Sequence, residues 1–338
     1  MLILSRRAFL GGSLAAAAWG QQPEISAFDL SLLDDWLTPT ESFFVREHFP
    51  PPKVSAHGWT LQFSGAVAAP FEISYDDLLR EPRKVLPATL ECAENPVGGG
   101  LVSHAEWTGV SLDSLLDRAQ PVPEARAVRL VAADGYRRSI PLAKARHADT
   151  LIVHGMNGER LTEKHGFPLR AVVPGWYCMD AVKWLQRIEV LTTEEDSPPA
   201  SRDYVRLTKS MLLGMRPAGR VAAMNVKAAF SRPVDGAILI GRQFIVRGAA
   251  WAGENRIRSV EVSVDGGKSW GPARLSPEAR PYAWVHWAYD WKVPGPGAHE
   301  LVVRATDDAG RAQPAERARD RADNYEQDSW QTIRVMVT

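Results

Sequence analysis

One of the two cysteines of the chain, Cys92, stands between an apolar stretch and a loop. Residues 85–90 are apolar and include β-branched side chains, which predicts a strand. Asn95, Pro96 and three glycines at 98–100 then predict a loop whose backbone other groups can approach closely. A thiolate presented at a strand end can bind a soft metal or act as a nucleophile. From this stretch alone, a buried and inert cysteine stays an open alternative.

The composition is that of a soluble globular protein large enough for two domains. The chain has 338 residues, of which 45% are hydrophobic and 24% are charged. Because 40 basic and 40 acidic residues cancel, charge gives no case for a nucleic acid or an anionic membrane as partner. Two cysteines cannot build a disulfide scaffold.

The N-terminus has the pattern of an export signal. Arg6 and Arg7 precede a mild apolar run at 9–19 that is too short to span a bilayer, and the first acidic residue is Glu24. We therefore expect residues 1–22 to be a twin-arginine signal peptide and the mature protein to be periplasmic. This route exports folded proteins, often with a cofactor already inserted. No later segment is apolar enough to span a membrane, and we expect no membrane span in the mature chain.

The following segment, 23–200, predicts an α+β domain of short strands and few long helices. Helices are expected at 29–36 and 110–119, the second with Ser111 near its N-cap, and strands at 59–67, 127–132, 150–153 and 187–191. The sequence has no GxGxxG after a strand and no P-loop, which argues against nucleotide-binding folds of those types. A polar, proline-containing stretch at 194–200 predicts a linker.

From residue 228 onward the apolar residues alternate with a period of two. Short strands separated by glycine- and proline-rich turns indicate an all-β sandwich of immunoglobulin type, which we place at 201–338. The expected strands are 237–251, 257–264, 283–293, 299–305 and 330–337. This region contains no cysteine, and no disulfide can join its sheets.

Several separated motifs together resemble the sulfite oxidase family of molybdenum enzymes, in family order. They are TPTESFFVREHFPPP (38–52), TLECAEN (89–95), HAEWTGVSLDSLL (104–116), DGYRRSIPL (134–142), HGFPLRAVVPGW (165–176) and VKWL (182–185). The hairpin Asp265, Gly266, Gly267, Trp270 matches the family's C-terminal domain. The resemblance implies a mixed molybdopterin-binding domain followed by an immunoglobulin-like dimerisation domain, and a homodimer.

The resemblance also implies roles for particular residues and a molybdenum–molybdopterin cofactor. Cys92 would be the protein's thiolate ligand to molybdenum, with two further sulfurs from the pterin. Tyr136 would sit beside the metal, Trp107 would line the substrate pocket, and Arg46 would contact the pterin or face the metal. The other implied cofactor-binding residues are Glu47, His48, Asp134, His165, Arg170 and Lys183. Arginine and lysine are the side chains expected around a phosphate.

The chain departs from the family pattern beside the metal ligand. Sulfite oxidases usually carry an arginine shortly after the cysteine, and here it is missing, while Glu94 replaces a glycine. A second arginine from the C-terminal domain has no clear match. Such a site should bind a dianion less well, and Arg46 and Arg138 are the candidates to compensate. Cys178 has no explanation in the family pattern.

The resulting hypothesis is a periplasmic oxidoreductase that transfers an oxo group to a small sulfur-containing substrate, with sulfite to sulfate as the first candidate. The sequence has no haem-binding CxxCH, and we expect no haem in this chain and an external electron carrier such as a c-type cytochrome. Sulfane dehydrogenase chemistry on a protein-bound sulfur and reduction of an S- or N-oxide stay open. A cofactor-free secreted binding protein and a cysteine hydrolase are alternatives from other classes.

Overall fold

The structure is a computed structural model that describes residues 23–194, 204–209 and 219–338. The predicted signal peptide at 1–22, most of the predicted linker and the predicted boundary at 200/201 lie outside these residues. Within the described ranges, no helix has both the length and the apolar character needed to cross a membrane.

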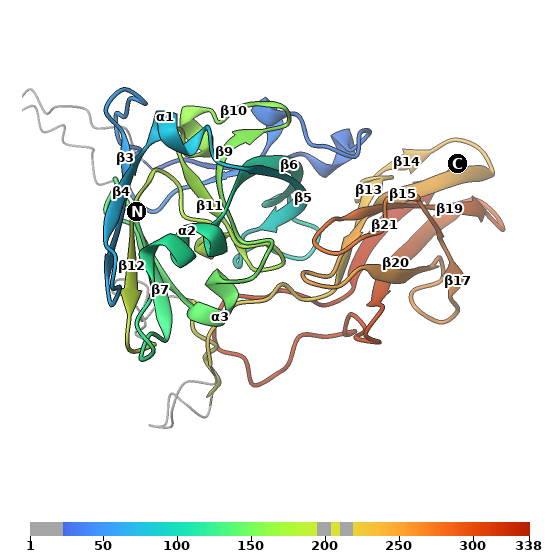
Figure 1. The fold of residues 1–338 in the computed structure, drawn as a ribbon. Coiled ribbons are helices and arrows are strands. Elements are labelled where there is room, and N and C mark those ends of the chain that lie inside the picture. Colours follow the sequence, from blue (N-terminus) through green and yellow to red (C-terminus); the bar gives the residue numbers. More distant parts are fainter. Residues whose placement is uncertain (1–22, 195–203, 210–218) are drawn as a thin grey trace, which may run out of the picture.

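The N-terminal part is built on two five-stranded sheets (Figure 1). One has the order β10-β9-β6-β5 with β11 also paired to β9: β5 Arg83–Glu91, β6 Val102–Ser111, β9 Leu151–Met156, β10 Glu159–Arg160, β11 Arg170–Val172. The other has the order β4-β3-β12-β7-β8: β3 Thr60–Gly65, β4 Phe71–Ser74, β7 Ala127–Ala132, β8 Arg137–Pro141, β12 Leu185–Leu191. A small additional sheet pairs β1 Ile25–Ser26 with β2 Val45–Arg46. The strand expected at 85–90 is confirmed and lies within β5.

Helices are short and few in the described N-terminal part, as expected. They are α1 Tyr75–Leu78, α2 Leu112–Ala119 and α3 Leu142–Ala145, with single 3-10 turns η1 Leu30–Leu32, η2 Thr40–Ser42, η3 Glu163–His165 and η4 Cys178–Asp180. In α2 the apolar residues at positions 112, 115, 116 and 119 share one face and are buried, which packs the helix into the core.

The helix expected at 29–36 is wrong. Its residues form one 3-10 turn, in which the Asp29 carboxylate accepts a bond from the Ser31 N–H at 2.9 Å. The chain then bends at 35–37, where the Trp36 indole donates to the Trp284 carbonyl at 3.2 Å and ties this segment to the C-terminal part.

The C-terminal part is the expected β-sandwich of two sheets. One has the order β13-β15-β19-β18: β13 Lys227–Arg232, β15 Gln243–Trp251, β18 Arg274–Leu275, β19 Val285–Lys292. The other has the order β14-β21-β20-β16-β17: β14 Ile238–Leu239, β16 Ile257–Ser263, β17 Gly271–Pro272, β20 Gly297–Asp307, β21 Gln331–Val337. The strand expected at 237–251 is interrupted, because Gly241 adopts a φ of 126° between β14 and β15.

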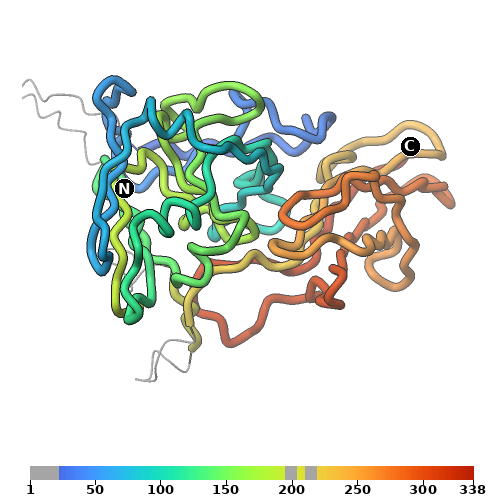
Figure 2. The backbone as a smooth tube through the Cα atoms, in the orientation of Figure 1, coloured from blue at the N-terminus to red at the C-terminus, as the bar shows by residue number. Residues whose placement is uncertain are grey.

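The sandwich and the N-terminal sheets share a buried boundary beside Cys92. Figure 2 shows that the yellow and orange-red segments of the chain run along this boundary. The Trp284 indole donates to the Trp36 carbonyl at 2.8 Å, and the Trp284 N–H donates to the Thr89 hydroxyl at 2.8 Å. Thr89 is part of β5, and the strand that leads to Cys92 is therefore bonded directly to the sandwich.

A buried ion pair strengthens this boundary. The Glu91 carboxylate, which immediately precedes Cys92, accepts from the Lys227 ammonium at 2.6 Å and from the Trp251 indole at 2.8 Å. It also accepts from the Asn95 amide at 3.0 Å. Glu91 is fully buried and Lys227 is 2% exposed. Both charges depend on each other, because neither has water to stabilise it.

We predict that Lys227→Met lowers the free energy of unfolding by about 3–5 kcal/mol, because it leaves the Glu91 carboxylate buried without its cation. Urea titration followed by tryptophan fluorescence measures the change. Arg319→Met, which removes a pair with Glu316 at the surface, is the matched control and should leave the unfolding midpoint almost unchanged. Equal effects of the two substitutions would contradict the structural role of the buried pair.

Candidate active site

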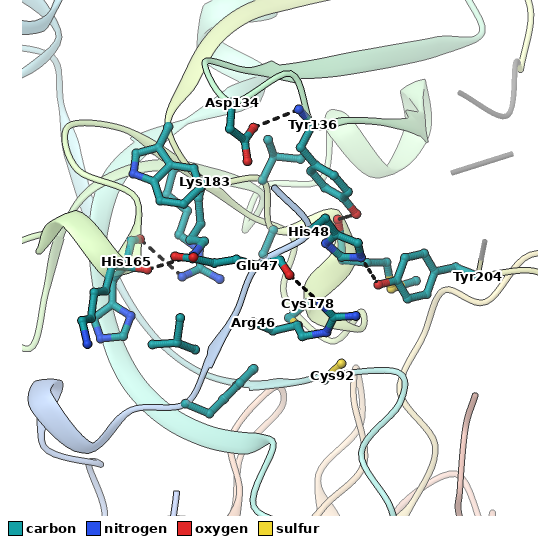
Figure 3. Close-up of a pocket in the computed structure, with 18 residues that line it drawn as sticks. Arg46, Glu47, His48, Cys92, Asp134, Tyr136, His165, Cys178, Lys183 and Tyr204 are labelled. Carbon is teal, nitrogen blue, oxygen red and sulfur yellow. Dashed lines mark hydrogen bonds and ion pairs between the residues drawn. The ribbon is translucent and has the colours of Figure 1, made fainter. Parts of the chain in front are cut away.

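A cavity of about 600 Å³, counting the solvent at its mouth, collects nearly all of the residues that the sequence singled out (Figure 3). Its walls come from β2, the end of β5, the β7–β8 turn, η3, β11 and the segment around η4. The predicted residues that line it are Arg46, Glu47, His48, Cys92, Asp134, Tyr136, His165, Arg170 and Lys183. Residues from these six segments and Tyr204, which belongs to a seventh, therefore meet at one place.

Cys92 lies directly after the end of β5, where backbone bonds fix its position. Its N–H donates to the Leu101 carbonyl and its carbonyl accepts from the Asn95 N–H, both at 2.9 Å. Its sulfur forms a hydrogen bond with the Cys178 thiol and accepts from the Glu94 N–H. The bond to Cys178, followed by that to Glu94, lowers the pKa of Cys92. The same thiol pair, followed by burial, raises the pKa of Cys178.

Arg170 brings a buried positive charge into the cavity. It is 5% exposed and, within the described part of the chain, has no carboxylate partner. One guanidinium nitrogen donates to the His165 carbonyl at a long 3.4 Å, and the Nε group has no partner there. Burial lowers its pKa to about 10. An uncompensated buried cation is costly, and its presence in a cavity indicates an anionic ligand.

Lys183 and His165 stand on the same wall as Arg170. The Lys183 ammonium donates to the Glu47 carboxylate at 3.1 Å and to the Lys164 carbonyl at 2.9 Å. Burial lowers the pKa of Lys183 to about 8, although Glu47 opposes the shift. Burial likewise lowers the pKa of His165 to about 4. Because His165 Nε2 lies 2.9 Å from the Thr40 carbonyl, it carries the proton, and Nδ1 is left as an acceptor.

Arg46 and Asp134 complete the predicted set, each with a bond inside the protein. Arg46 donates to the Glu94 carboxylate at 3.0 and 3.2 Å and to the Glu47 carbonyl at 2.5 Å. The Asp134 carboxylate accepts from the Tyr136 N–H at 2.9 Å, and burial raises its pKa. Glu94 therefore neutralises Arg46.

The tyrosine hydroxyl beside His48 belongs to Tyr204, which none of the sequence motifs includes. The Tyr204 hydroxyl lies 2.5 Å from His48 Nε2, and burial lowers the pKa of His48 to about 4. Tyr136, which the family resemblance places beside the metal, lines the cavity and donates its buried hydroxyl to the Met179 carbonyl at 3.0 Å. Its ring stacks on His48 with centroids 4.8 Å apart. No sequence pattern marked Tyr204, because it follows the linker in a segment without periodicity.

Trp107 does not line the cavity, which corrects the expectation of a substrate-pocket residue. It is fully buried on β6, and its indole donates to the Ala88 carbonyl at 3.2 Å. The Arg170 guanidinium lies 5.2 Å from the centre of its ring. Trp107 therefore packs against Arg170 from the core side, because the alternation of β6 points its side chain into the core.

Arg138, which was expected to compensate for the missing arginine, is already paired. It is buried and donates to the Asp180 carboxylate at 2.9 Å, and Arg220 donates to the same oxygen at 2.7 Å. Arg46 and Arg138 are therefore both engaged by carboxylates in this structure.

The donor set fits a metal that arrives with its own ligands. Among the described residues no group of three or more His, Cys, Asp or Glu side chains could hold a bare metal ion. The cavity instead offers one thiolate at Cys92 and a cationic wall at Arg170 and Lys183. A cofactor that carries both its own sulfur ligands and a phosphate, such as molybdopterin, satisfies both features.

Comparisons with known proteins give the same picture. The model named "Oxidoreductase molybdopterin binding domain" matches residues 48–199, and "Mo-co oxidoreductase dimerisation domain" matches residues 219–337. The sulfite oxidase of Gallus gallus is 33% identical over 317 residues, which covers 84% of this chain and 69% of that protein. The mitochondrial sulfite oxidase of Homo sapiens is 34% identical, and the match covers 84% of this chain and 58% of that protein, less than two thirds of its length.

A solved structure extends the similarity over almost the whole chain. The sulfane dehydrogenase SoxCD from Paracoccus pantotrophus superposes with a TM-score of 0.83 at 28% identity and covers 96% of this chain and 92% of that one. The fold, the two family models and the level of identity to sulfite oxidases agree. This chain belongs to the sulfite oxidase family of molybdopterin-dependent oxidoreductases.

Proposed function

We propose that the cavity holds molybdenum–molybdopterin and that the enzyme oxidises a small sulfur compound, with sulfite to sulfate as the first candidate. The observation that carries this proposal is the presence of the Cys92 sulfur and the unpaired Arg170 guanidinium in one cavity. Electrons would leave to an external carrier, for which a c-type cytochrome is the candidate, since we expect no haem in this chain.

The residues of the cavity divide into two groups in this proposal. Cys92 would ligate the metal as a thiolate, which its hydrogen bonds favour. Arg170 and Lys183 would hold the cofactor's phosphate, with His165 and Asp134 offering an acceptor nitrogen and a carboxylate to the pterin ring. When bound, the molybdenum centre supplies oxo transfer to a sulfur lone pair and takes up two electrons.

His48, held by Tyr204, would accept the proton that accompanies turnover. With a pKa of about 4, His48 is neutral at pH 7 and can accept a proton. Its Nε2 lies 2.5 Å from the Tyr204 hydroxyl, and burial raises the pKa of that hydroxyl, which keeps its proton and holds the imidazole in place. Arg46, Arg138 and Lys183 disfavour a charged His48, which would return the proton readily.

A second candidate function, oxidation of a sulfane sulfur carried by a protein partner, has a specific observation in its favour. Glu94 neutralises Arg46 next to Cys92, which weakens the site for a dianion such as sulfite. A sulfur held on a carrier protein does not need two cations beside the metal. The similarity to a sulfane dehydrogenase structure supports the same candidate. Reduction of an S- or N-oxide is the third reaction that an assay should include.

We also propose that the enzyme works in the periplasm as a homodimer. Arg6 and Arg7 before a short apolar run support export of the folded, loaded protein. The match of residues 219–337 to a dimerisation domain supports the dimer. Protease protection of the protein in intact and in osmotically shocked cells would test the location.

We predict that Cys92→Ser keeps the bound pterin but loses turnover, because a hydroxyl is a poor substitute for a thiolate as a soft ligand. The measurement combines molybdenum and pterin content with steady-state assays on sulfite, thiosulfate and an S-oxide. The content values separate lost chemistry from lost cofactor. Full activity of the variant would remove Cys92 from the metal site, and a wild-type protein without molybdenum would end the proposal.

We predict that Glu94→Gln lowers KM for sulfite by about tenfold, which corresponds to about 1.4 kcal/mol, because it frees the charge of Arg46. Added salt should reduce the difference between variant and wild type, since it screens a partly exposed pair. Glu72→Gln, at an exposed carboxylate on β4, is the matched control and should not change KM. An unchanged or higher KM in Glu94→Gln would show that Glu94 does not weaken anion binding.

We predict that Arg170→Met abolishes cofactor retention while the cofactor-free protein becomes no less stable. Removing an unpaired buried cation should leave the free energy of unfolding unchanged or raise it by about 1–2 kcal/mol. Pterin content and urea unfolding of the cofactor-free chain give the two readouts. A variant that loses several kcal/mol and still retains its pterin would assign Arg170 to the fold rather than to the cofactor.

A further inference from the structure

Both cysteines of the chain face the same cavity. Cys92 follows β5 and Cys178 begins η4, and Figure 3 shows both at the same cavity. The two thiols interact with each other, which shifts the pKa values of both. Cys92 is 2% exposed and Cys178 is partly buried. The chain has no third cysteine. Any disulfide formed within one chain must therefore join these two residues.

The arrangement needs little movement to form a covalent bond. Two thiols in hydrogen-bond contact need a modest closing of their side chains to reach an S–S bond of about 2 Å. The backbone is held on both sides, at Cys92 by its bonds to Leu101 and Asn95 and at Cys178 by the bond that its carbonyl accepts from the Ala181 N–H at 3.0 Å. The S–S bond would therefore form by rotation of the two side chains.

We propose that Cys92 and Cys178 form a reversible disulfide when the cavity holds no cofactor, which blocks the metal ligand until a thiol reduces it. This inference rests on the role of Cys92 proposed above. It gives Cys178 a function that the metal site itself does not require.

The oxidation balances with a peroxide as the oxidant. The Cys92 thiolate attacks one peroxide oxygen, which forms a sulfenic acid and releases hydroxide. The Cys178 thiol then attacks the Cys92 sulfur, the S–S bond forms, and the sulfenic oxygen leaves as water after taking up the proton of the thiol. Together the two thiols give up two electrons and two protons, and one peroxide becomes two waters. A dithiol returns the electrons and restores both cysteines.

Occupancy of the site decides whether this reaction can occur. A Cys92 sulfur bound to a metal is not free to attack a peroxide. The loaded protein should therefore keep Cys178 as a thiol that can be alkylated after unfolding, whereas the cofactor-free protein should lose both thiols to the disulfide.

The test uses the full-length chain purified with and without molybdopterin. Each sample is treated with hydrogen peroxide, unfolded, alkylated and measured by intact mass and by non-reducing peptide mapping. We expect the cofactor-free chain to lose about 2 Da, to resist alkylation and to yield a Cys92–Cys178 linked peptide pair. Dithiothreitol should reverse all three changes. Uptake of added molybdopterin should be blocked before this reduction and restored after it.

Cys178→Ser and Cys178→Ala are the control variants, and far-UV circular dichroism checks their fold. Without its partner thiol, Cys92 should accumulate sulfinic and sulfonic acid that dithiothreitol does not reverse. Two alkylatable thiols in peroxide-treated, cofactor-free wild type would overturn the proposal, whatever the variants do. If the disulfide forms equally in loaded and cofactor-free protein, Cys92 is not a metal ligand, and the proposed function fails instead.

Discussion

The buried pair between Glu91 and Lys227 is the interaction on which the site depends. Glu91 belongs to β5 and precedes Cys92 directly, whereas Lys227 begins β13 of the sandwich. Trp251, also from the sandwich, donates to the same carboxylate. The sandwich thus holds the end of β5 in place through this ion pair. Separating the two charges would be costly, because no water is present to stabilise either of them. The sandwich positions the reactive cysteine as well as carrying the family's dimerisation region.

The arginines in and around the cavity differ in whether a carboxylate neutralises them. The wall with Arg170 keeps an uncompensated cation, which suits a phosphate that remains bound. At Arg46 the positive charge is cancelled by Glu94, and the Arg138 and Arg220 cations share the Asp180 carboxylate. Of these arginines, Arg170 alone has no carboxylate partner among the described residues. This difference favours tight cofactor binding over strong attraction of an anionic substrate.

Structural features that short stretches of sequence determine could be predicted. Features that depend on contacts between distant segments could not. Strand alternation and turn residues predicted the β-sandwich. Short motifs predicted that Cys92, His165 and Arg170 belong to one site. Tyr204 escaped notice because its place beside His48 is set by a backbone bond from Val221, across a stretch with no periodic pattern. Trp107 was misplaced for a related reason. A motif shows that a tryptophan is present, but the pleat of β6 decides which side it faces.

A cavity with this composition makes folding and cofactor loading interdependent. Burying the Arg170 charge without a counter-charge lowers the stability of the fold. A phosphate that pairs with Arg170 removes this penalty, and the gain adds to the binding free energy. A ligand that binds only the folded state also stabilises the fold by mass action. In the same cavity the Cys92 sulfur interacts with the Cys178 thiol. An unpaired cation and an unprotected thiolate are therefore two consequences of one arrangement, and filling the cavity resolves both at once.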